Sequence, residues 1–256
     1  MIHTHDPQLL RSRVQEAFLD GGILSQATQQ FQPRTGQTDM ALAVADVISE
    51  GGSLVVEAGT GVGKTFAYLV PALLSGERVL LSTATKALQD QLFARDIPRL
   101  IAAFNLPIRL ALLKGRSNYL CTHRMQMARQ DASLPDRHVV RLLAKVETWA
   151  LTTQTGDLAE LPGLDERSSL IPWITSNREN CLGSQCPAFK NCHVNNARRD
   201  ALAADIVVIN HHLFFADLAV RESGMAELLP SVRVVVFDEA HQLNETGVNF
   251  LGQQLS

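Results

Sequence analysis

Apolar positions along the chain gather into five short runs that indicate buried strands. Within each run the hydrophobic residues are mostly consecutive rather than alternating, which is typical of strands covered on both faces of a parallel sheet. The predicted strands are Leu54–Ala58, Val79–Thr83, Ile108–Leu113, Ile206–Asn210 and Val232–Phe237.

The segments between these runs have helical character. They predict helices over Thr38–Glu50, Lys64–Ser75, Lys86–Phe104 and Asn195–Ala204. Alternation of strand and helix indicates an α/β fold with a parallel sheet and right-handed crossovers. Residues 121–199 interrupt this alternation, because they lack strand-like runs and contain every cysteine of the chain. We therefore expect a mainly helical subdomain inserted between two strands of the sheet.

Composition limits the class of protein. A chain of 256 residues with 46% hydrophobic content can bury one sizeable core and has room for a satellite subdomain. No run of about 18 apolar residues is present, and Met1–Asp20 is polar where a signal peptide would be apolar. These features predict a cytoplasmic protein with no membrane partner.

Charge gives a mixed indication about nucleic acid. The net charge of −3 is no basic signature, yet residues 78–124 hold eight Lys or Arg against two Asp. This local excess is either a phosphate-binding surface or a solvated face.

A glycine-rich segment follows the first predicted strand and precedes a predicted helix. This is the context of a phosphate-binding loop, whose glycines let backbone N–H groups face a polyphosphate. Lys64 is placed to reach the β- and γ-phosphates, Thr65 to ligate Mg²⁺, and the helix N-terminus to add its dipole. A chance Gly-Lys-Thr in a turn would not account for the flanking strand and helix. The predicted nucleotide-binding residues are Ala58, Gly59, Thr60, Gly61, Val62, Gly63, Lys64 and Thr65, with Ala58 where the strict pattern has its first glycine.

Two adjacent carboxylates end the last predicted strand, in the sequence Asp238-Glu239-Ala240-His241. In enzymes with a phosphate-binding loop, an acidic residue at this strand end holds Mg²⁺ and its neighbour polarises the attacking water. We predict Asp238 as a ligand of Mg²⁺ and of the nucleotide, Glu239 as the general base, and Lys64 as the third catalytic residue. An ordinary loop start explains an Asp-Glu pair alone, but not its pairing with a phosphate-binding loop.

The cysteines indicate a metal centre. Cys121, Cys181, Cys186 and Cys192 are the only ones, and three of them lie within twelve residues. In a cytoplasmic chain such a group favours metal binding over disulfides. One distant cysteine and three at longer gaps favour a [4Fe–4S] cluster over tetrahedral zinc, whose ligands usually form two close pairs. On spacing alone, zinc and unrelated thiols stay open.

The glycine-rich loop, the acidic box and the four cysteines between them resemble the DinG/XPD-like iron–sulfur DNA helicases of superfamily 2. Flanking segments agree, namely Leu113–Cys121, Asn180–Gly183 and, for the YoaA type, Asn210–Phe214. The resemblance implies ATP hydrolysis coupled to 5′–3′ movement on single-stranded DNA and to unwinding of forked DNA. It further implies a role in repair or replication and a protein partner from those processes.

The resemblance also divides the chain. It implies a RecA-like domain over residues 1–115 and 201–256 and a [4Fe–4S] subdomain over residues 116–200, with the four cysteines as ligands. Within Phe31–Gln37, it implies that Gln37 contacts adenine and that Arg34 supports this contact.

Candidate DNA contacts lie in two segments. Thr83, Thr85 and Lys86 follow a strand and begin a helix, where hydroxyls, a helix N-terminus and a lysine suit a sugar–phosphate backbone. An N-capped helix explains the threonines equally well. Arg116 and Tyr119, beside Cys121, suit a phosphate contact and base stacking, with plain packing as the alternative for Tyr119.

One further segment joins the same sheet edge. Asn210, His211 and His212 end a predicted strand, so they have a coupling role or include a buried, hydrogen-bonded histidine.

The chain stops at Ser256, shortly after the acidic box, and contains no second RecA-like domain to supply arginine fingers. We therefore expect this chain alone to bind nucleotide weakly and not to unwind DNA. The alternative class is a non-catalytic module, in which the metal centre senses redox state and the loop only holds nucleotide. A kinase or transporter ATPase has no supporting substrate or signature loop in the sequence.

Overall fold

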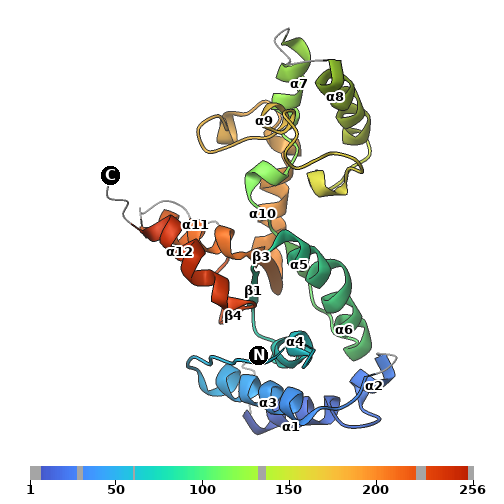
Figure 1. The fold of residues 1–256 in the computed structure, drawn as a ribbon, viewed down its shortest axis with the longest axis vertical. Coiled ribbons are helices and arrows are strands. Elements are labelled where there is room, and N and C mark those ends of the chain that lie inside the picture. The colour runs from blue at the N-terminus through green and yellow to red at the C-terminus, as the bar shows by residue number, and fades with distance from the viewer. Residues whose placement is uncertain (1–6, 28–30, 60, 132–136, 223–228, 253–256) are drawn as a thin grey trace. The chain divides into compact units, whose positions relative to one another are not determined.

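The chain forms two compact units (Figure 1). One comprises Met1–Ala111 with Ala204–Ser256, and the other comprises Leu112–Ala203. The first unit is α/β and the second is mainly helical. The computed structural model describes residues 7–27, 31–59, 61–131, 137–222 and 229–252.

The α/β unit contains a four-stranded sheet in the order β2-β3-β1-β4. Its central strand β1 pairs in parallel with β3 from Val79↔Ile206 to Thr83↔Asn210, and with β4 from Val79↔Val234 to Ser82↔Phe237. The carboxyl ends of these three strands therefore meet at one edge, as expected for a parallel sheet that positions a ligand site. The strands are β1 (Val79–Thr83), β2 (Leu110–Leu112), β3 (Ile206–Asn210) and β4 (Val234–Phe237).

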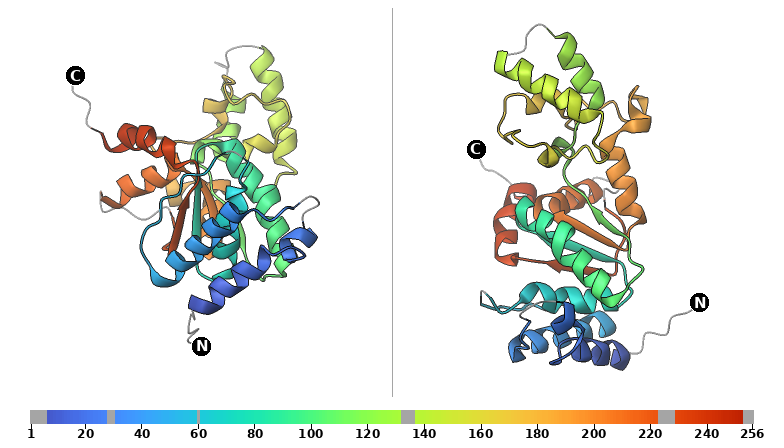
Figure 2. Two further views of the ribbon diagram at one scale, coloured as in Figure 1. Left: turned by 60° about the horizontal axis from the view of Figure 1, so that its bottom comes forward. Right: turned by 90° about the vertical axis from the view of Figure 1, so that its right-hand side faces the viewer.

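Helices cover both faces of the sheet. In Figure 1, α5 and α6 lie on one side of the strands, and α11 and α12 lie on the other. The earlier helices α1, α3 and α4 pack against one another, blue to cyan in Figure 2. The helices are α1 (Pro7–Ala17), α2 (Ile23–Ala27), α3 (Thr35–Glu50), α4 (Lys64–Leu74), α5 (Lys86–Gln91), α6 (Ile97–Phe104), α11 (His211–Glu222) and α12 (Leu243–Leu251), with a π-turn η1 (Leu92–Asp96) and a 3₁₀ turn η6 (Ala240–Gln242).

The predicted strand Leu54–Ala58 is wrong. This segment is irregular, and Leu54, Val55 and Val56 are 40%, 95% and 41% exposed. A strand needs a neighbour to satisfy its backbone hydrogen bonds, and this segment pairs with none of the described strands, although β2 and β4 are edge strands of the sheet. The segment also follows Gly51 and Gly52, whose positive φ values turn the chain out of helix α3.

Other predicted boundaries are shifted. The strands predicted at 108–113 and 232–237 are shorter in the structure, where they form β2 and β4. Near the start of each, two successive backbone N–H groups donate to one carbonyl: those of Asp205 and Ile206 to Arg109, and those of Arg233 and Val234 to Arg78.

The predicted helix at 86–104 forms as three consecutive segments, α5, η1 and α6. Pro98 lies in the first turn of α6 and has no N–H to donate. The preceding π-turn accommodates this missing bond by widening the helix for one turn.

The second unit has its own core. Helices α7 and α8 pack with the short α9 around Leu143, Val146, Leu170 and Ile174, all of which are buried. Its elements are η2 (Arg116–Asn118), α7 (Thr122–Gln130), α8 (Arg137–Ala150), η3 (Leu158–Glu160), α9 (Ile171–Ile174), η4 (Gly183–Gln185), η5 (Phe189–Asn191) and α10 (His193–Ala203). Helix formation within residues 112–203 agrees with the absence of strand-like runs in the sequence.

No described helix combines the length and the apolar character that crossing a bilayer requires.

Candidate nucleotide site and cysteine segments

The glycine-rich loop ends on a residue that only glycine suits. Gly63 has φ 89° and ψ 33° and directly precedes Lys64, the first residue of α4. A Cβ at Gly63 would lie 2.1 Å from Nε2 of Gln37, so a side chain there would collide as well as strain the backbone. Gly61 also has positive φ, whereas Gly59 does not. Thr60 lies outside the described residues.

Lys64 lies between the loop and the acidic box. Its Nζ donates to the carbonyl of Ala58 at 3.3 Å and lies 3.8 Å from Oε1 of Glu239. Both charged side chains are about one-third exposed, which leaves them accessible to a ligand from solvent. The structure thus brings together the lysine and the second carboxylate, although they are far apart in sequence.

Asp238 is linked to helix α4 through Tyr68. The buried Tyr68 hydroxyl donates to Oδ2 of Asp238 at 3.2 Å. Burial raises the pKa of Tyr68 well above its ordinary value, and the Asp238 charge raises it further, so the phenol remains a donor. Burial raises the pKa of Asp238, the Tyr68 hydrogen bond lowers it, and the Glu239 charge raises it again, with a net rise. Thr65, the other predicted magnesium ligand, lowers the pKa of Tyr68 in part, so its side chain lies near the same phenol.

Tyr68 was not predicted from the sequence. It lies three residues after Thr65 in the same helix, so it shares the face of α4 that meets Asp238. That spacing was the available signal.

The two residues assigned to adenine contact the phosphate-binding loop in this structure. Gln37 is buried, and its Nε2 donates to the carbonyl of Gly63 at 2.8 Å. Arg34 Nη1 donates to the carbonyl of Gly61. The segment at 31–37 is therefore held against the loop by side-chain bonds to its backbone.

The segment with the predicted DNA contacts needs a correction. Thr83 is buried and its Oγ1 donates to the carbonyl of Thr85, so it is not placed to contact DNA. Thr85 is exposed and caps helix α5, because its Oγ1 accepts from Leu88 N at 3.2 Å. Capping is thus the role that the structure gives to Thr85, while Lys86 starts the helix at the same sheet edge.

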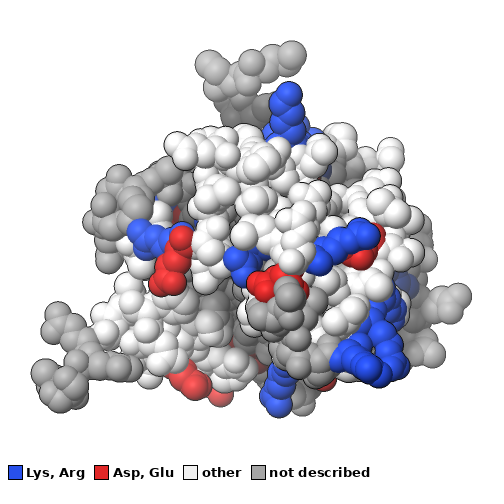
Figure 3. Space-filling view, turned by 90° about the horizontal axis from the view of Figure 1, so that it is seen from above, with Lys and Arg blue, Asp and Glu red and all other residues white. Residues whose placement is uncertain are grey.

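The basic stretch at 78–124 is not one basic surface. Its residues are divided between the two units. Several of its cations are paired with acids, including Arg95 with Asp96 and Arg109 with Asp205. The face drawn in Figure 3 likewise shows Lys and Arg in separate groups, several of them beside Asp or Glu.

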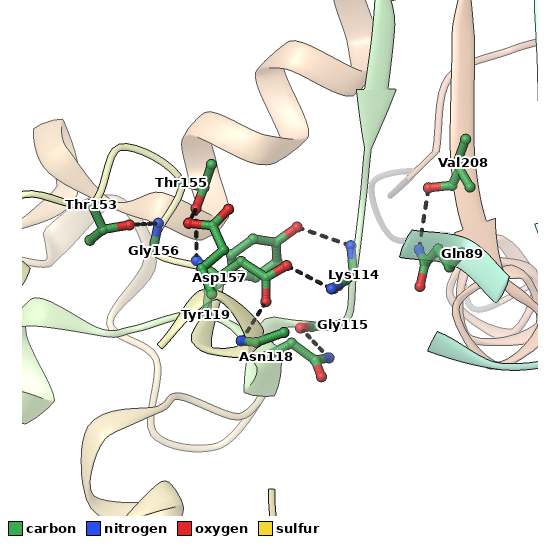
Figure 4. A network of polar contacts seen from close by, with 12 residues as sticks. Gln89, Lys114, Gly115, Asn118, Tyr119, Thr153, Thr155, Gly156, Asp157 and Val208 are labelled. Atoms are coloured by element: carbon green, nitrogen blue, oxygen red, sulfur yellow. Dashed lines mark hydrogen bonds and ion pairs between the residues drawn. The ribbon is translucent and has the colours of Figure 1, made fainter. Parts of the chain in front are cut away.

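A buried polar network fixes the segment before Cys121. Lys114 Nζ lies 2.6 Å from Oδ2 of Asp157, and the two side chains are only 2% and 9% exposed (Figure 4). Tyr119 is 4% exposed, and its hydroxyl accepts from Lys114 N at 3.0 Å. Leu120 N donates to the carbonyl of Gly156 at 2.8 Å. The network therefore holds residues 114–120 against the loop that precedes η3.

This burial corrects the stacking role predicted for Tyr119. A ring that is almost fully covered, with its hydroxyl engaged, is a packing residue and offers no face to a base. Arg116 is partly exposed, and its Nη1 donates to the carbonyl of Asn177 at 3.3 Å.

The four cysteines are free thiols of the second unit. Burial raises the pKa of Cys121, and the charges of Cys186 and Cys192 raise it further, which shows that these thiols lie within electrostatic range. Cys181 is exposed. Among the described residues, however, no three His, Cys, Asp or Glu side chains are gathered closely enough to hold a metal ion. The donor chemistry fits an iron–sulfur cluster, whereas the thiol positions in this structure do not form its cage.

Comparison with known proteins agrees with the loop and box. Residues 38–133 match the family model described as "DEAD/DEAH box helicase". The chain is 49% identical over 245 residues to "ATP-dependent DNA helicase YoaA" of Haemophilus influenzae, covering 96% of this chain and 38% of that protein. It is 48% identical to the protein of the same name from Escherichia coli, covering 93% of this chain and 38% of the relative. It is 40% identical to "ATP-dependent helicase DinG" of Mycobacterium tuberculosis, covering 87% of this chain and 36% of the relative.

The chain therefore spans little more than a third of the length of these relatives. Its α/β unit, with a four-stranded sheet, is consistent with a RecA-like helicase domain. On this similarity, the chain belongs to the family of the YoaA and DinG proteins, whose members compared above are named ATP-dependent helicases.

Proposed function

We propose that this chain supplies the nucleotide-binding half of an ATP-dependent DNA helicase motor. The loop from Ala58 to Thr65 binds the phosphates of ATP, and Thr65 and Asp238 hold Mg²⁺. Glu239 accepts a proton from the attacking water, and Lys64 neutralises charge on the β- and γ-phosphates. Hydrolysis drives 5′–3′ movement on single-stranded DNA and separation of forked duplexes, in repair or replication.

One observation carries this proposal, namely the convergence of Lys64 with the acidic pair. Lys64 Nζ is 3.8 Å from Glu239, while Tyr68 joins helix α4 to Asp238 at 3.2 Å. A cation, a hydroxyl and two carboxylates beside a glycine-rich helix N-terminus match the needs of a magnesium-bound triphosphate. The names of the relatives add that related chains are ATP-dependent DNA helicases.

The test is ATP hydrolysis by the chain extended to the length of its relatives. We expect single-stranded DNA to stimulate hydrolysis, and 5′-tailed forks to be unwound in preference to 3′-tailed forks. Hydrolysis that is indifferent to every DNA tested would contradict the motor and favour a nucleotide-holding module.

We further propose that Cys121, Cys181, Cys186 and Cys192 hold a [4Fe–4S] cluster in the second unit. The support is a set of four free thiols in one unit and the contribution of Cys186 and Cys192 to the raised pKa of Cys121. Cys121 follows the buried network around Lys114, so one ligand would be presented by a rigid segment. A bound cluster would tie the loops at 181–192 to this segment.

Anaerobically prepared chain is expected to contain about four iron and four sulfide per molecule, with the brown colour of iron–sulfur charge transfer. Cys121→Ser should lower the iron content severalfold, because it removes a ligand from the fixed segment. Elemental analysis and visible absorption are the measurements. One zinc per chain with no iron would contradict the cluster in favour of a zinc site, and a metal-free chain would contradict both.

A further inference from the structure

A buried histidine connects the acidic pair with the strand that leads to Thr83 and Thr85. His211 begins α11 and is 1% exposed. Its Nδ1 lies 2.7 Å from Oγ of Ser82, which is fully buried in β1. The backbone carbonyl of Ser82 in turn accepts from Asp238 N at 2.9 Å. Ser82 thus contacts both His211 and the residue proposed to hold Mg²⁺.

The other nitrogen of this imidazole faces the acidic pair without a well-formed hydrogen bond. Nε2 of His211 is buried, and no partner among the residues that the structure describes meets hydrogen-bond geometry with it, although the backbone of Asp238 and Glu239 lies close enough to raise the pKa of the ring. Burial lowers the pKa of His211, while the nearby backbone of Asp238 and Glu239 raises it in part. A buried polar atom without a hydrogen bond is destabilising, so its presence calls for an explanation. The groups nearest to offer it a bond belong to the acidic pair.

The backbone at the acidic pair is itself strained. Glu239 has φ 55° and ψ 45°, the left-handed region that residues other than glycine rarely adopt. In this conformation the Cβ lies close to the following carbonyl oxygen, which strains the backbone.

Ser82 is well placed to transmit a change at the acidic pair. Thr83 follows it in the chain and donates to the carbonyl of Thr85, and Thr85 caps α5 at the start that carries Lys86. A displacement of Ser82 therefore reaches the helix start proposed to face DNA through a short series of hydrogen bonds.

We propose that His211 is a positioning residue that couples the acidic pair to the segment at 83–86. Engagement of Mg²⁺ and nucleotide draws the backbone of Asp238 and Glu239 toward Nε2, and the Nδ1 bond passes this position to Ser82. The inference rests on the proposed function of the Lys64, Asp238 and Glu239 site, and adds to it the route by which nucleotide and DNA affect each other.

Two conservative variants of His211 separate the contributions of its two ring nitrogens. His211→Asn retains a polar atom near Nδ1 and the bond to Ser82, whereas His211→Gln reaches toward the position of Nε2. Ser82→Ala removes the partner of Nδ1 with little change in volume. The matched control is His212→Asn, since His212 is the neighbouring residue and is exposed.

The measurement is the Kd of a fluorescent ATP analogue with Mg²⁺, taken with and without a saturating oligothymidylate. In the wild-type chain we expect DNA to change this Kd at least about fivefold, the low end of ordinary coupling between sites. In His211→Asn, His211→Gln and Ser82→Ala we expect a ratio near one, with the Kd of each ligand alone within about threefold of wild type. His212→Asn should keep the wild-type ratio.

Three results would overturn the proposal. The Kd of the ATP analogue could be the same with and without DNA in the wild-type chain, or all three variants could keep the wild-type effect of DNA on this Kd. The variants could also bind both ligands more weakly while DNA still changes the Kd as in the wild type. The last would make His211 a packing residue only. Failure of the proposed function looks different, because the wild-type chain would then bind no nucleotide, or Lys64→Ala would bind it equally well.

Discussion

Lys114→Met is expected to lower the free energy of unfolding of the second unit by about 3–5 kcal/mol. The variant leaves the carboxylate of Asp157 buried without its cation, at a site where both side chains are almost fully covered. Such an uncompensated charge costs more than the ion pair itself contributes. Urea unfolding followed by tryptophan fluorescence is the measurement, because Trp149 and Trp173 both lie against the core of this unit.

An exposed ion pair in the same unit provides the control. Arg129 and Glu147 lie 3.3 Å apart, with Arg129 73% exposed. Arg129→Gln should therefore change stability by no more than about 1 kcal/mol. The double variant Lys114→Met with Asp157→Leu should lose less than Lys114→Met alone, since it removes both charges. Equal, small losses for the buried and the exposed pair would contradict the network that Figure 4 shows.

Glu239→Gln is expected to lower the rate of DNA-stimulated ATP hydrolysis about 10²–10⁴-fold in the chain extended to the length of its relatives. Glutamine keeps the shape of the side chain but is a poor proton acceptor, so the variant still binds ATP but hydrolyses it slowly. The Kd for ATP with Mg²⁺ should stay within about threefold of wild type. Steady-state hydrolysis and equilibrium binding, measured on the same preparation, separate these effects.

The control for this variant is Glu245→Gln. Glu245 is exposed in the first turn of α12, in the same unit, and should leave hydrolysis unchanged. Hydrolysis by Glu239→Gln at near the wild-type rate would remove Glu239 from the role of base.

Local patterns in the sequence predict the central strands well. Consecutive, mainly apolar residues are buried at every position of Val79–Thr83 and at all but the last position of Ile206–Asn210, and both strands have the predicted bounds. The same kind of run at 54–58 gives no strand, because pairing depends on a neighbouring edge that no local pattern encodes. Hydrophobicity predicts that a segment tends to be buried, whereas the topology of the sheet decides whether a neighbouring strand is available for pairing.

Residue types at the site were easier to predict than their contacts. Lys64 and Glu239 converge as the loop and box require. Tyr68 was missed, because a tyrosine in an apolar helix looks like ordinary core until Asp238 is placed beside it. Thr83 and Tyr119 carry suitable groups for DNA, but their burial depends on packing from segments distant in sequence.

The buried ion pair shows the same limit. Lys114 belongs to a basic stretch and looks like a surface cation, and its partner Asp157 lies in a polar loop 43 residues later. Only the fold of the second unit places the two together. The counter-charge of a buried lysine is in general not deducible from sequence when the partner is distant.

The central claim is that the glycine-rich loop and the acidic pair form one magnesium-dependent nucleotide site. Isothermal titration of ATP, with and without Mg²⁺, into the wild-type chain, Lys64→Ala, Asp238→Asn and the exposed control Lys190→Ala tests it most directly. We expect Mg²⁺ to tighten binding to the wild type and to Lys190→Ala. Lys64→Ala should weaken binding about 10–150-fold, as loss of a hydrogen bond to a charged group predicts, and Asp238→Asn should abolish the effect of Mg²⁺. Wild-type affinity and an unchanged magnesium effect in both site variants would contradict the account.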